Sequence, residues 1–495
     1  MTKLAFLVLL LALTLNAQTL RPNYWLDDDI RFYHHRGALW QFSPLQRPYS
    51  VQRLREATNT LKTLEPGYAV LQKLPAAEAE QRALAWAVLD NAVVREQNES
   101  RLHAVQRATL GGQINPHVQA YTTFYIDNQL DADSSYIGER QNGLAAFMEQ
   151  AYISVEYQAF HLKFGRDYLV WGPGRDAALL LSAHSRPMDQ LYASWQNRWI
   201  QFSFVTATLD QTEYEVDGEP STQHRYLSGH RLEFRPARYL RIGFSETALF
   251  AGPDAGYDFA LLNPVTFYTG VQHNGPQTAN VMASADVAWM PFSFVTLYGS
   301  FLMDDIQLED ETVDDKGEPA EWGVLAGFDW ADPFGVYGLD LFAEYTRVTN
   351  RTYNGQGGPW EKYLHRNQPI GHVLGNDFDR WLAGFSYRPL PQWRSRVMYE
   401  RRRRGEGRVH KPFDAPWRDV PPGETYSEPF PTGVVETSQR LFVATRWQPL
   451  WWLYGEAWVS YWDVQQVDNQ LGRDDTFWDV RVRLSVEWLG TTSVR

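Results

Sequence analysis

The stretch that decides the fold runs from Phe160 to Gln190 and has the sequence F-H-L-K-F-G-R-D-Y-L-V-W-G-P-G-R-D-A-A-L-L-L-S-A-H-S-R-P-M-D-Q. Its first residues alternate large apolar side chains with polar or small ones, which predicts a strand with two different faces. The W-G-P-G segment at 171–174 then interrupts the strand, because proline lacks the N–H and glycines favour turns. A two-faced strand that ends in a long aromatic and charged loop is typical of a membrane β-barrel at its rim.

The composition agrees with a membrane barrel. Of the 495 residues, 15% are aromatic, and the mean hydropathy is −0.43. No segment after residue 17 approaches the run of about 20 apolar residues that a membrane helix needs. This combination suits an outer-membrane barrel, whose strands are only half apolar. The absence of cysteine excludes disulfides and thiol chemistry, and the net charge of −13 disfavours nucleic acid as a partner.

Three regions are predicted along the chain. Residues 1–17 have a basic start, an apolar core and a small residue before a cleavage point, which is typical of a signal peptide. Residues 18–112 are predicted to form a mostly helical periplasmic segment, with a small independent helical domain as the alternative. Residues 113–495 are predicted to form the transmembrane barrel with long extracellular loops.

Two amphipathic helices are expected in the second region. One follows Ser50, a plausible N-cap, and the other follows Pro75 and extends to about residue 98. In the second helix, Trp86, Leu89 and Val93 would share one face.

Sixteen strands with period-two alternation are predicted in the barrel region. They span 115–126, 144–157, 158–168, 189–196, 199–209, 224–234, 239–250, 280–291, 293–306, 322–331, 337–349, 378–388, 393–404, 437–447, 452–465 and 475–489. From Trp199 onward the connections alternate between long and short, as they do in barrels with extracellular loops and periplasmic turns. The same parity places the loop after 158–168 outside the cell and the C-terminus in the periplasm.

The strand 393–404 indicates which face meets the lipid. Trp393 and Tyr399 lie on one face, and Arg394 and Glu400 lie on the other. Charged side chains are costly in lipid, so the charged face is expected to line a wet lumen. The strand 475–489 divides in the same way. A soluble β-sandwich would also alternate, but it would not readily explain the long and short connections.

The sequence contains no strong catalytic, cofactor or metal motif, so neither enzyme activity nor a cofactor is predicted. Ser182, His184 and Asp189 occur in one loop, but closeness in sequence does not define a triad. An outer-membrane hydrolase would need a site that the fold assembles. The pair His34-His35 offers too few ligands for a metal site.

Two loops, 350–377 and 405–436, combine aromatic rings with amide, carboxylate and guanidinium groups. Sugars bind to an aromatic platform through their C–H face and to planar polar groups through their hydroxyls. The residues predicted to bind polysaccharide are Trp171, Arg175, Asp189, Tyr353, Trp360, Tyr363, His365, Arg366, Asn376, Asp377, Trp417 and Arg418. Alternatively, these aromatic residues pack the loops together or form the interfacial girdle.

Four consecutive arginines, Arg401 to Arg404, end the strand 393–404. Alternation directs Arg401 and Arg403 outward, to the level of lipopolysaccharide phosphates, and the other two inward. Contact with outer-membrane lipid is expected there. Binding of an acidic polysaccharide is the alternative, since arginine matches carboxylate geometry.

Four motifs in this order resemble the Wzi capsule assembly family. They are D-D-D-I-R-F-Y-H-H-R-G-A-L-W-Q-F-S from Asp27, V-W-G-P-G-R-D-A-A-L-L-L-S-A-H-S-R-P-M from Val170, G-H-R-L-E-F-R-P-A-R-Y-L-R-I-G from Gly229 and Y-L-H-R-N-Q-P-I-G-H-V-L-G-N-D-F-D from Tyr363. The resemblance implies an outer-membrane barrel of 18 strands with a periplasmic helical bundle and a lectin-like role. Two strands are missing from the count above, and the apolar part of 251–279 is a candidate for one further hairpin.

The expected function is attachment or organisation of capsular or other surface polysaccharide at the cell outer membrane, without catalysis. Lipopolysaccharide and a polysaccharide export machinery are further expected partners. The alternative is a substrate-selective porin for sugars or ions, and the two functions differ in whether the lumen is open. The W-G-P-G turn is expected to form a plug-like loop with Trp171 and Arg175 near the ligand path, although it could instead face outward as a sugar platform.

Overall fold

The computed structural model describes residues 27–50, 53–54, 57, 83–96, 99–115, 117–130, 133–140, 144–216, 219–252, 258–274, 279–305, 317–355, 358–421, 424 and 426–492. The expected signal peptide and most of the first expected helix lie outside these residues. Within them, no helix is both long enough and apolar enough to cross a membrane.

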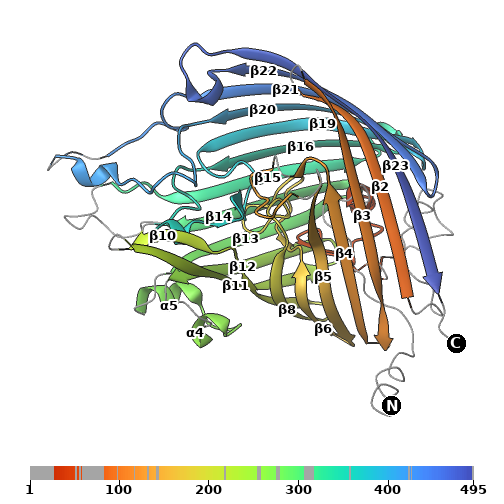
Figure 1. Ribbon diagram of the computed structural model, residues 1–495, viewed down its shortest axis with the longest axis horizontal. Coiled ribbons are helices and arrows are strands. Elements are labelled where there is room, and N and C mark those ends of the chain that lie inside the picture. The colour runs from red at the N-terminus through yellow and green to blue at the C-terminus, as the bar shows by residue number, and fades with distance from the viewer. Residues whose placement is uncertain are drawn as a thin grey trace.

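Strands make up most of the described chain (Figure 1). The long strands are β2 (Ala83–Glu96), β3 (Glu99–Asn115), β4 (Val118–Asp127), β5 (Ala145–Tyr157), β6 (Phe160–Asp167), β8 (Met188–Gln196), β9 (Ile200–Thr208), β11 (Glu219–Ala237), β12 (Leu240–Gly252), β13 (Ala279–Phe292), β14 (Val295–Asp305), β15 (Glu321–Ala331), β16 (Leu339–Val348), β19 (Phe378–Leu390), β20 (Trp393–Arg404), β21 (Glu436–Leu450), β22 (Leu453–Gln465) and β23 (Asp475–Thr492). The short strands are β1 (Gln46–Arg47), β7 (Val170–Trp171), β10 (Thr212–Val216), β17 (Leu364–His365) and β18 (Gln368–Pro369). The helices are α2 (Asp27–His35), α4 (Phe259–Leu262) and α5 (Tyr268–Asn274), with 3₁₀ turns η4 (Pro333–Gly335), η5 (Pro359–Glu361), η6 (Pro416–Asp419) and η7 (Val467–Asn469).

The long strands form a closed antiparallel barrel of 18 strands, and β10 only extends β11 beyond the ring. The ring closes where β2 pairs with β23, from Ala83 opposite Thr492 to Arg95 opposite Val480. Figure 1 shows these first and last strands side by side. Closure removes every free sheet edge, as a sheet that spans a membrane requires.

All sixteen strands expected from the sequence are confirmed, with ends that differ by a few residues. The expected helix after Pro75 is wrong over 83–96, which is β2. The following residues form β3, so the barrel begins at Ala83 rather than at residue 113. These two strands complete the count of 18. The segment 251–279 holds α4 and α5 instead of a further hairpin.

The prediction of a helix failed because the spacing of apolar residues in this segment fits a helix and a strand equally. Leu89 and Val93 are four residues apart, so they share a face in a helix and also in a strand. In β2 both side chains point out to the lipid, while Val88 and Val94 point inward and are buried. Pairing with β23 and β3 on either side decides the outcome, since long-range partners override local preference.

The two ends of the barrel differ in the length of their connections. One end, named here the turn end, has links of two to seven residues between strands. The links at the other end, named the loop end, have nine residues or more, apart from the link between β2 and β3. This confirms the alternation expected from the sequence. Short turns are periplasmic and long loops extracellular in outer-membrane barrels.

The division into lipid and lumen faces is also confirmed. On β20, Trp393 and Tyr399 are exposed to the lipid, whereas Glu400 is buried inside. On β23, Trp478 and Val482 are exposed, and Ser485 is fully buried. In the opening stretch, Phe160, Leu162 and Phe164 are exposed on the lipid face of β6, and Lys163 is buried on the other face.

The lumen is filled by three chain segments, named here the plug: residues 27–50, 168–187 and 349–377 (Figure 1). Backbone hydrogen bonds join them. β1 pairs with β7, and the Ser182 N–H donates to the Ile370 carbonyl at 2.8 Å. Apolar side chains of the plug then pack on inward-facing residues of the wall, so the main hydrophobic core of this barrel lies inside its lumen.

Candidate functional site

The W-G-P-G turn folds inward, as one of the two alternatives from the sequence proposed. Trp171 is 1% exposed and lies against Gly229 of β11. Gly172 has φ = +130°, a conformation that L side chains rarely adopt. At Gly174, a Cβ atom would collide with the carbonyl oxygen of Ala177. Both glycines are therefore needed for the chain to turn back into the lumen.

The Asp329 carboxylate of β15 ties the turn to the barrel wall. It forms ion pairs with Arg175 of the turn and with Arg31 and His35 of α2. Burial alone would lower the pKa of Arg175, but the carboxylates of Asp329 and Asp340 raise it well above its usual value. Arg31 also donates to the carbonyls of Pro173 and Gly174, at 2.7 and 3.0 Å. Arg175 is thus held as a structural cation of the plug.

Eight of the twelve residues predicted to bind polysaccharide have buried side chains. They are Trp171, Arg175, Tyr353, Tyr363, His365, Asn376, Asp377 and Trp417. The remaining four are half-buried or exposed, namely Asp189, Trp360, Arg366 and Arg418. Packing within the loops, the alternative left open by the sequence, is what the structure shows for the buried set. Their part in polysaccharide binding stays a prediction.

The aromatic pair of the loop 349–377 lies at the centre of the plug. Tyr353 and Tyr363 stack with ring centroids 5.8 Å apart and an interplanar angle of 13°. The Tyr353 hydroxyl donates to the Leu179 carbonyl at 2.5 Å, and the Tyr363 hydroxyl lies 3.1 Å from that of Thr247. Burial raises the pKa of both phenols. The pair joins the loop to the opening stretch and to the wall.

Other residues that were predicted to bind polysaccharide also make contacts within or between the loops. Asp377 accepts hydrogen bonds from the backbone N–H groups of Gly407 and Thr432, and Trp417 lies under the Arg351 guanidinium at 5.0 Å. The Trp360 carbonyl accepts from Arg225 at 2.8 Å. Arg418 is exposed on η6, in the 405–435 loop. Asp377 and Trp417 thus connect the long loops to one another.

Three arginines lie near one another at the loop end, one on the barrel strand β6 and two in segments of the plug. We name Arg166, Arg186 and Arg366 the outer arginine cluster. Arg166 forms a bidentate ion pair with Asp189, at 2.9 and 2.5 Å. Arg186 pairs with Asp133 at 2.8 Å and stacks over Phe147. The two carboxylates are 56% and 45% exposed, so both pairs face solvent.

Arg366 brings the third guanidinium to this cluster. It sits at the tip of the β17–β18 hairpin with φ = +49°, and its backbone N–H donates to Asp210 at 2.9 Å. Among the described residues, its Nε atom has no hydrogen-bond partner. Burial lowers the pKa of Arg366, and the like charges of Arg166 and Arg186 lower it further.

The histidines around the cluster are neutral at pH 7. His184 lies 2.9 Å from the amide oxygen of Gln368, and His365 lies 3.1 Å from Asp210. Burial lowers the pKa of both imidazoles. The positive charge of this surface therefore comes from its arginines.

Sequence reasoning included Asp189, His365 and Arg366 but missed Arg166 and Arg186. Arg166 is the residue before the last in β6, and Arg186 lies two residues before β8, so both sit at the rim of the same pair of strands. That position was readable from the predicted strand ends. Their proximity to Arg366, about 180 residues later in the chain, was not.

Ser182, His184 and Asp189 do not assemble as a triad. The Ser182 side chain is buried, His184 contacts Gln368, and Asp189 is held by Arg166. In the described part of the chain, no group of three or more His, Asp or Glu side chains could hold a metal ion. His35 instead pairs with Asp329.

The filled lumen predicts very low ion conductance for the wild-type protein. An 18-stranded barrel would be wide enough for a channel if it were empty. Here buried side chains such as Trp171, Tyr353 and Tyr363 occupy that space. Planar-bilayer recordings should show no steady openings, with an open porin as the positive control. A robust, stable channel would contradict the closed lumen.

Fold and surface together define a transmembrane β-barrel whose lumen is filled by its own chain and whose loop end carries three arginines beside carboxylate partners. The chain belongs to the capsule assembly protein Wzi family, whose model matches residues 78–477. It is thus an outer-membrane protein of a capsule assembly family, as the motifs in the sequence implied.

Two solved structures illustrate the similarity. One is Wzi, an outer membrane protein involved in group 1 capsule assembly in Escherichia coli and a carbohydrate-binding β-barrel. It is 14% identical, with coverage of 95% of this chain and 99% of that chain and a TM-score of 0.64. The other is OprD of Pseudomonas aeruginosa, 11% identical, with coverage of 83% and 95% and a TM-score of 0.47. No curated protein matches the chain in sequence.

Proposed function

We propose that this protein holds an acidic surface polysaccharide at the cell surface, through the outer arginine cluster and without catalysis. The observation that carries the proposal is the gathering of Arg166, Arg186 and Arg366 on one outward face. Each of these arginines has a carboxylate beside it, namely Asp189, Asp133 and Asp210, so an anionic ligand would bind by taking the place of such a carboxylate. Guanidinium groups match the planar carboxylates of acidic sugars.

The existing ion pairs do not prevent such binding. Solvent-exposed pairs contribute only about 0–1 kcal/mol, so a ligand carboxylate can replace Asp189 or Asp133 at little cost. Arg366 is half-buried, and its backbone N–H is held by Asp210, which fixes the hairpin tip beside the two ion pairs. The ring of Phe147 beneath Arg186 adds an apolar surface beside the charges. Polymer affinity then arises from repeated weak contacts.

Combined substitution of the outer arginine cluster tests this function. A hydrogen bond to a charged group is worth about 1.5–3 kcal/mol, so Arg166→Ala, Arg186→Ala and Arg366→Ala should each weaken binding about 10- to 100-fold. The measurement is binding of purified protein to the cell's own polysaccharide, together with retention of polysaccharide by cells that carry the triple variant.

Arg473→Ala is the matched control, because Arg473 is an exposed, paired arginine in a different loop. Its binding should stay at the wild-type level. Wild-type binding by the triple variant would refute the cluster as the site.

Two further partners belong to the same proposal. Arg401 is exposed at the loop-end rim of β20 and is suited to lipopolysaccharide phosphates. Its neighbour Arg403 is already paired with Asp379. A polysaccharide export machinery would deliver the polymer that the outer surface holds.

A further inference from the structure

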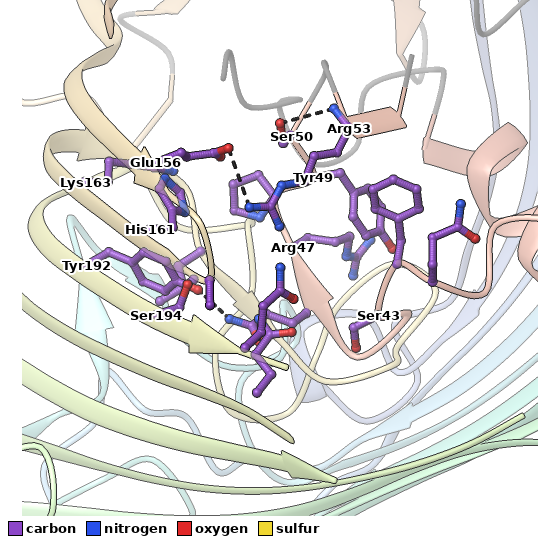
Figure 2. Close-up of a pocket in the computed structure, with 18 of the residues that line it drawn as sticks. Ser43, Arg47, Tyr49, Ser50, Arg53, Glu156, His161, Lys163, Tyr192 and Ser194 are labelled. Atoms are coloured by element: carbon purple, nitrogen blue, oxygen red, sulfur yellow. Dashed lines mark hydrogen bonds and ion pairs between the residues drawn. The ribbon is translucent and has the colours of Figure 1, made fainter. Parts of the chain in front are cut away.

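A large cavity lies at the opposite end of the barrel from the outer arginine cluster. Its volume is about 920 Å³, within the range of about 300–1,000 Å³ that small-ligand pockets occupy. Figure 2 shows its two sides: the N-terminal segment with Arg47, Tyr49 and Arg53, and the wall with His161 and Tyr192.

The cavity belongs to the turn end. Gln158 and Asn197 line it, and they lie in the short links β5–β6 and β8–β9. Short turns of outer-membrane barrels are periplasmic. A ligand would therefore enter this cavity from the periplasm.

Asp167 contacts three residues that line the cavity, namely Lys163, Tyr168 and Gln190. Its carboxylate pairs with Lys163 and accepts from Gln150 at 2.7 Å and from the Tyr168 N–H at 2.8 Å. Gln190 donates to the Asp167 carbonyl at 2.6 Å. This buried polar layer lies on the loop-end side of His161 and Lys163 along β6.

The cavity walls offer the groups that bind neutral sugars. Amides come from both sides, and hydroxyls come from serines and tyrosines. Aromatic rings lie among them. Tyr192 packs edge-on against His161 at 5.7 Å, and Phe42 packs edge-on against Tyr49 at 5.9 Å. Rings next to amides and hydroxyls suit the alternating C–H and O–H surface of a sugar.

The charges of the lining cations are already balanced. Arg47 pairs with Asp27 at 2.7 Å, and Arg53 lies 3.5 Å from Glu156. Lys163 is held by Asp167, and Arg235 lies 3.5 Å from Glu233. The pairs of Arg47 and Lys163 are largely buried, and buried pairs do not exchange partners readily. An uncharged ligand therefore fits better here than the acidic ligand proposed for the outer cluster.

Three buried polar atoms on the lining have no hydrogen-bond partner among the described residues. They are Oε1 of Gln190, Nε2 of His161 and Nε of Arg47. Gln190 is only 4% exposed, and its free oxygen belongs to a side chain that lines the cavity. Buried polar groups in folded proteins are nearly always paired. Because all three atoms are buried, a ligand would reach them only if their side chains turned toward the cavity.

We propose that this cavity is a second glycan site, which takes a short neutral oligosaccharide from the periplasmic side. This proposal deepens the proposed function, because it adds a site of different charge at the other end of the barrel. The ligand would hydrogen-bond the amides and hydroxyls of the lining and lie against Tyr192. The two sites share β6 and β8, and the Asp167 layer lies on the loop-end side of the cavity residues His161 and Lys163.

The absence of cysteine in the chain allows a test on folded protein. Ser194→Cys places one thiol on the cavity wall, and Ser134→Cys places one on the outward surface. A bulky, membrane-impermeant maleimide should label position 134 on intact cells but position 194 only after the outer membrane is permeabilised. Labelling after folding blocks the cavity without a risk to assembly.

Binding is measured by native mass spectrometry of the purified variants. The probe is the neutral fraction of short oligosaccharides released by mild acid from the cell's own surface polysaccharide. Unlabelled Ser194→Cys protein should retain the probe and lose it after labelling, and the probe should slow labelling several-fold. Labelled Ser134→Cys protein should bind as the wild type does.

Each outcome decides the proposal. No retained probe, or water only in the cavity, would overturn it, as would equal binding by labelled and unlabelled Ser194→Cys protein. Labelling of position 194 on intact cells would refute the periplasmic entry. The outer arginine triple variant separates the two sites: it should lose the long acidic polymer yet keep the neutral probe. Failure of the proposed function would leave the cavity result unchanged.

Discussion

Asp329→Ala is expected to lower the free energy of unfolding by about 3–5 kcal/mol, because removal of one partner from a buried ion-pair network leaves uncompensated charge. The Asp329 side chain is fully buried and contacts Arg31, His35 and Arg175 together. These three come from two different segments of the plug. Loss of the carboxylate therefore removes the link between α2, the W-G-P-G turn and the β15 wall.

Urea unfolding of the barrel in lipid vesicles measures this loss. Asp468→Ala is the matched control: its ion pair with Arg473 is exposed, at 67% and 53%, and such a pair contributes about 1 kcal/mol or less. A loosened plug should also give transient openings in planar bilayers. Unchanged unfolding of Asp329→Ala would mean that Asp340 and Glu344 suffice to hold Arg175.

Trp171→Ala should lower the free energy of unfolding by a similar amount, about 3–5 kcal/mol. This loss is typical when a large buried aromatic side chain is truncated in a packed interior. Trp171 lies in the main core and is 1% exposed. Its indole N–H has no hydrogen-bond partner among the described residues, so apolar packing dominates its contribution. The cavity left behind cannot collapse, since the barrel wall around it is closed by strand pairing.

The same unfolding experiment tests Trp171, with two comparisons. Trp171→Phe keeps an aromatic ring against Gly229 and should recover part of the loss. Trp478→Ala removes a tryptophan that faces the lipid, and its effect should be smaller. If Trp171→Ala and Trp478→Ala destabilised the barrel equally, the lumen would not be the packed core of this protein.

Much of the architecture could be predicted from the residues alone. Alternation along single strands, as in β20 and β23, assigned the lipid and lumen faces correctly. The lengths of the connections then ordered sixteen strands into an up-and-down barrel. Both signals are local, because side-chain alternation and turn length depend only on neighbouring residues. The resemblance to the family, which the match over residues 78–477 confirms, supplied the function class.

The parts that failed depend on distant partners. β2 is a strand because β23, nearly 400 residues away, and β3 complete its hydrogen bonds. Its alanine-rich sequence alone is equally compatible with a helix. The burial of Tyr353 and Tyr363 at the centre of the plug was likewise not readable from the sequence, and their part in sugar binding stays a prediction. Residue type indicates which chemistry is available but not which side chains reach solvent.

The opening stretch contains both kinds of information. By itself the sequence determined a strand, a forced turn at W-G-P-G and a return strand, because proline and glycine limit the backbone wherever they occur. Only the tertiary structure decided that the turn points into the lumen, where Asp329 holds Arg175. It also decided that Arg166 and Arg186 meet Arg366 outside and that His161 and Gln190 face a cavity inside. The physical reason is closure of the barrel, which brings together side chains that the chain keeps far apart.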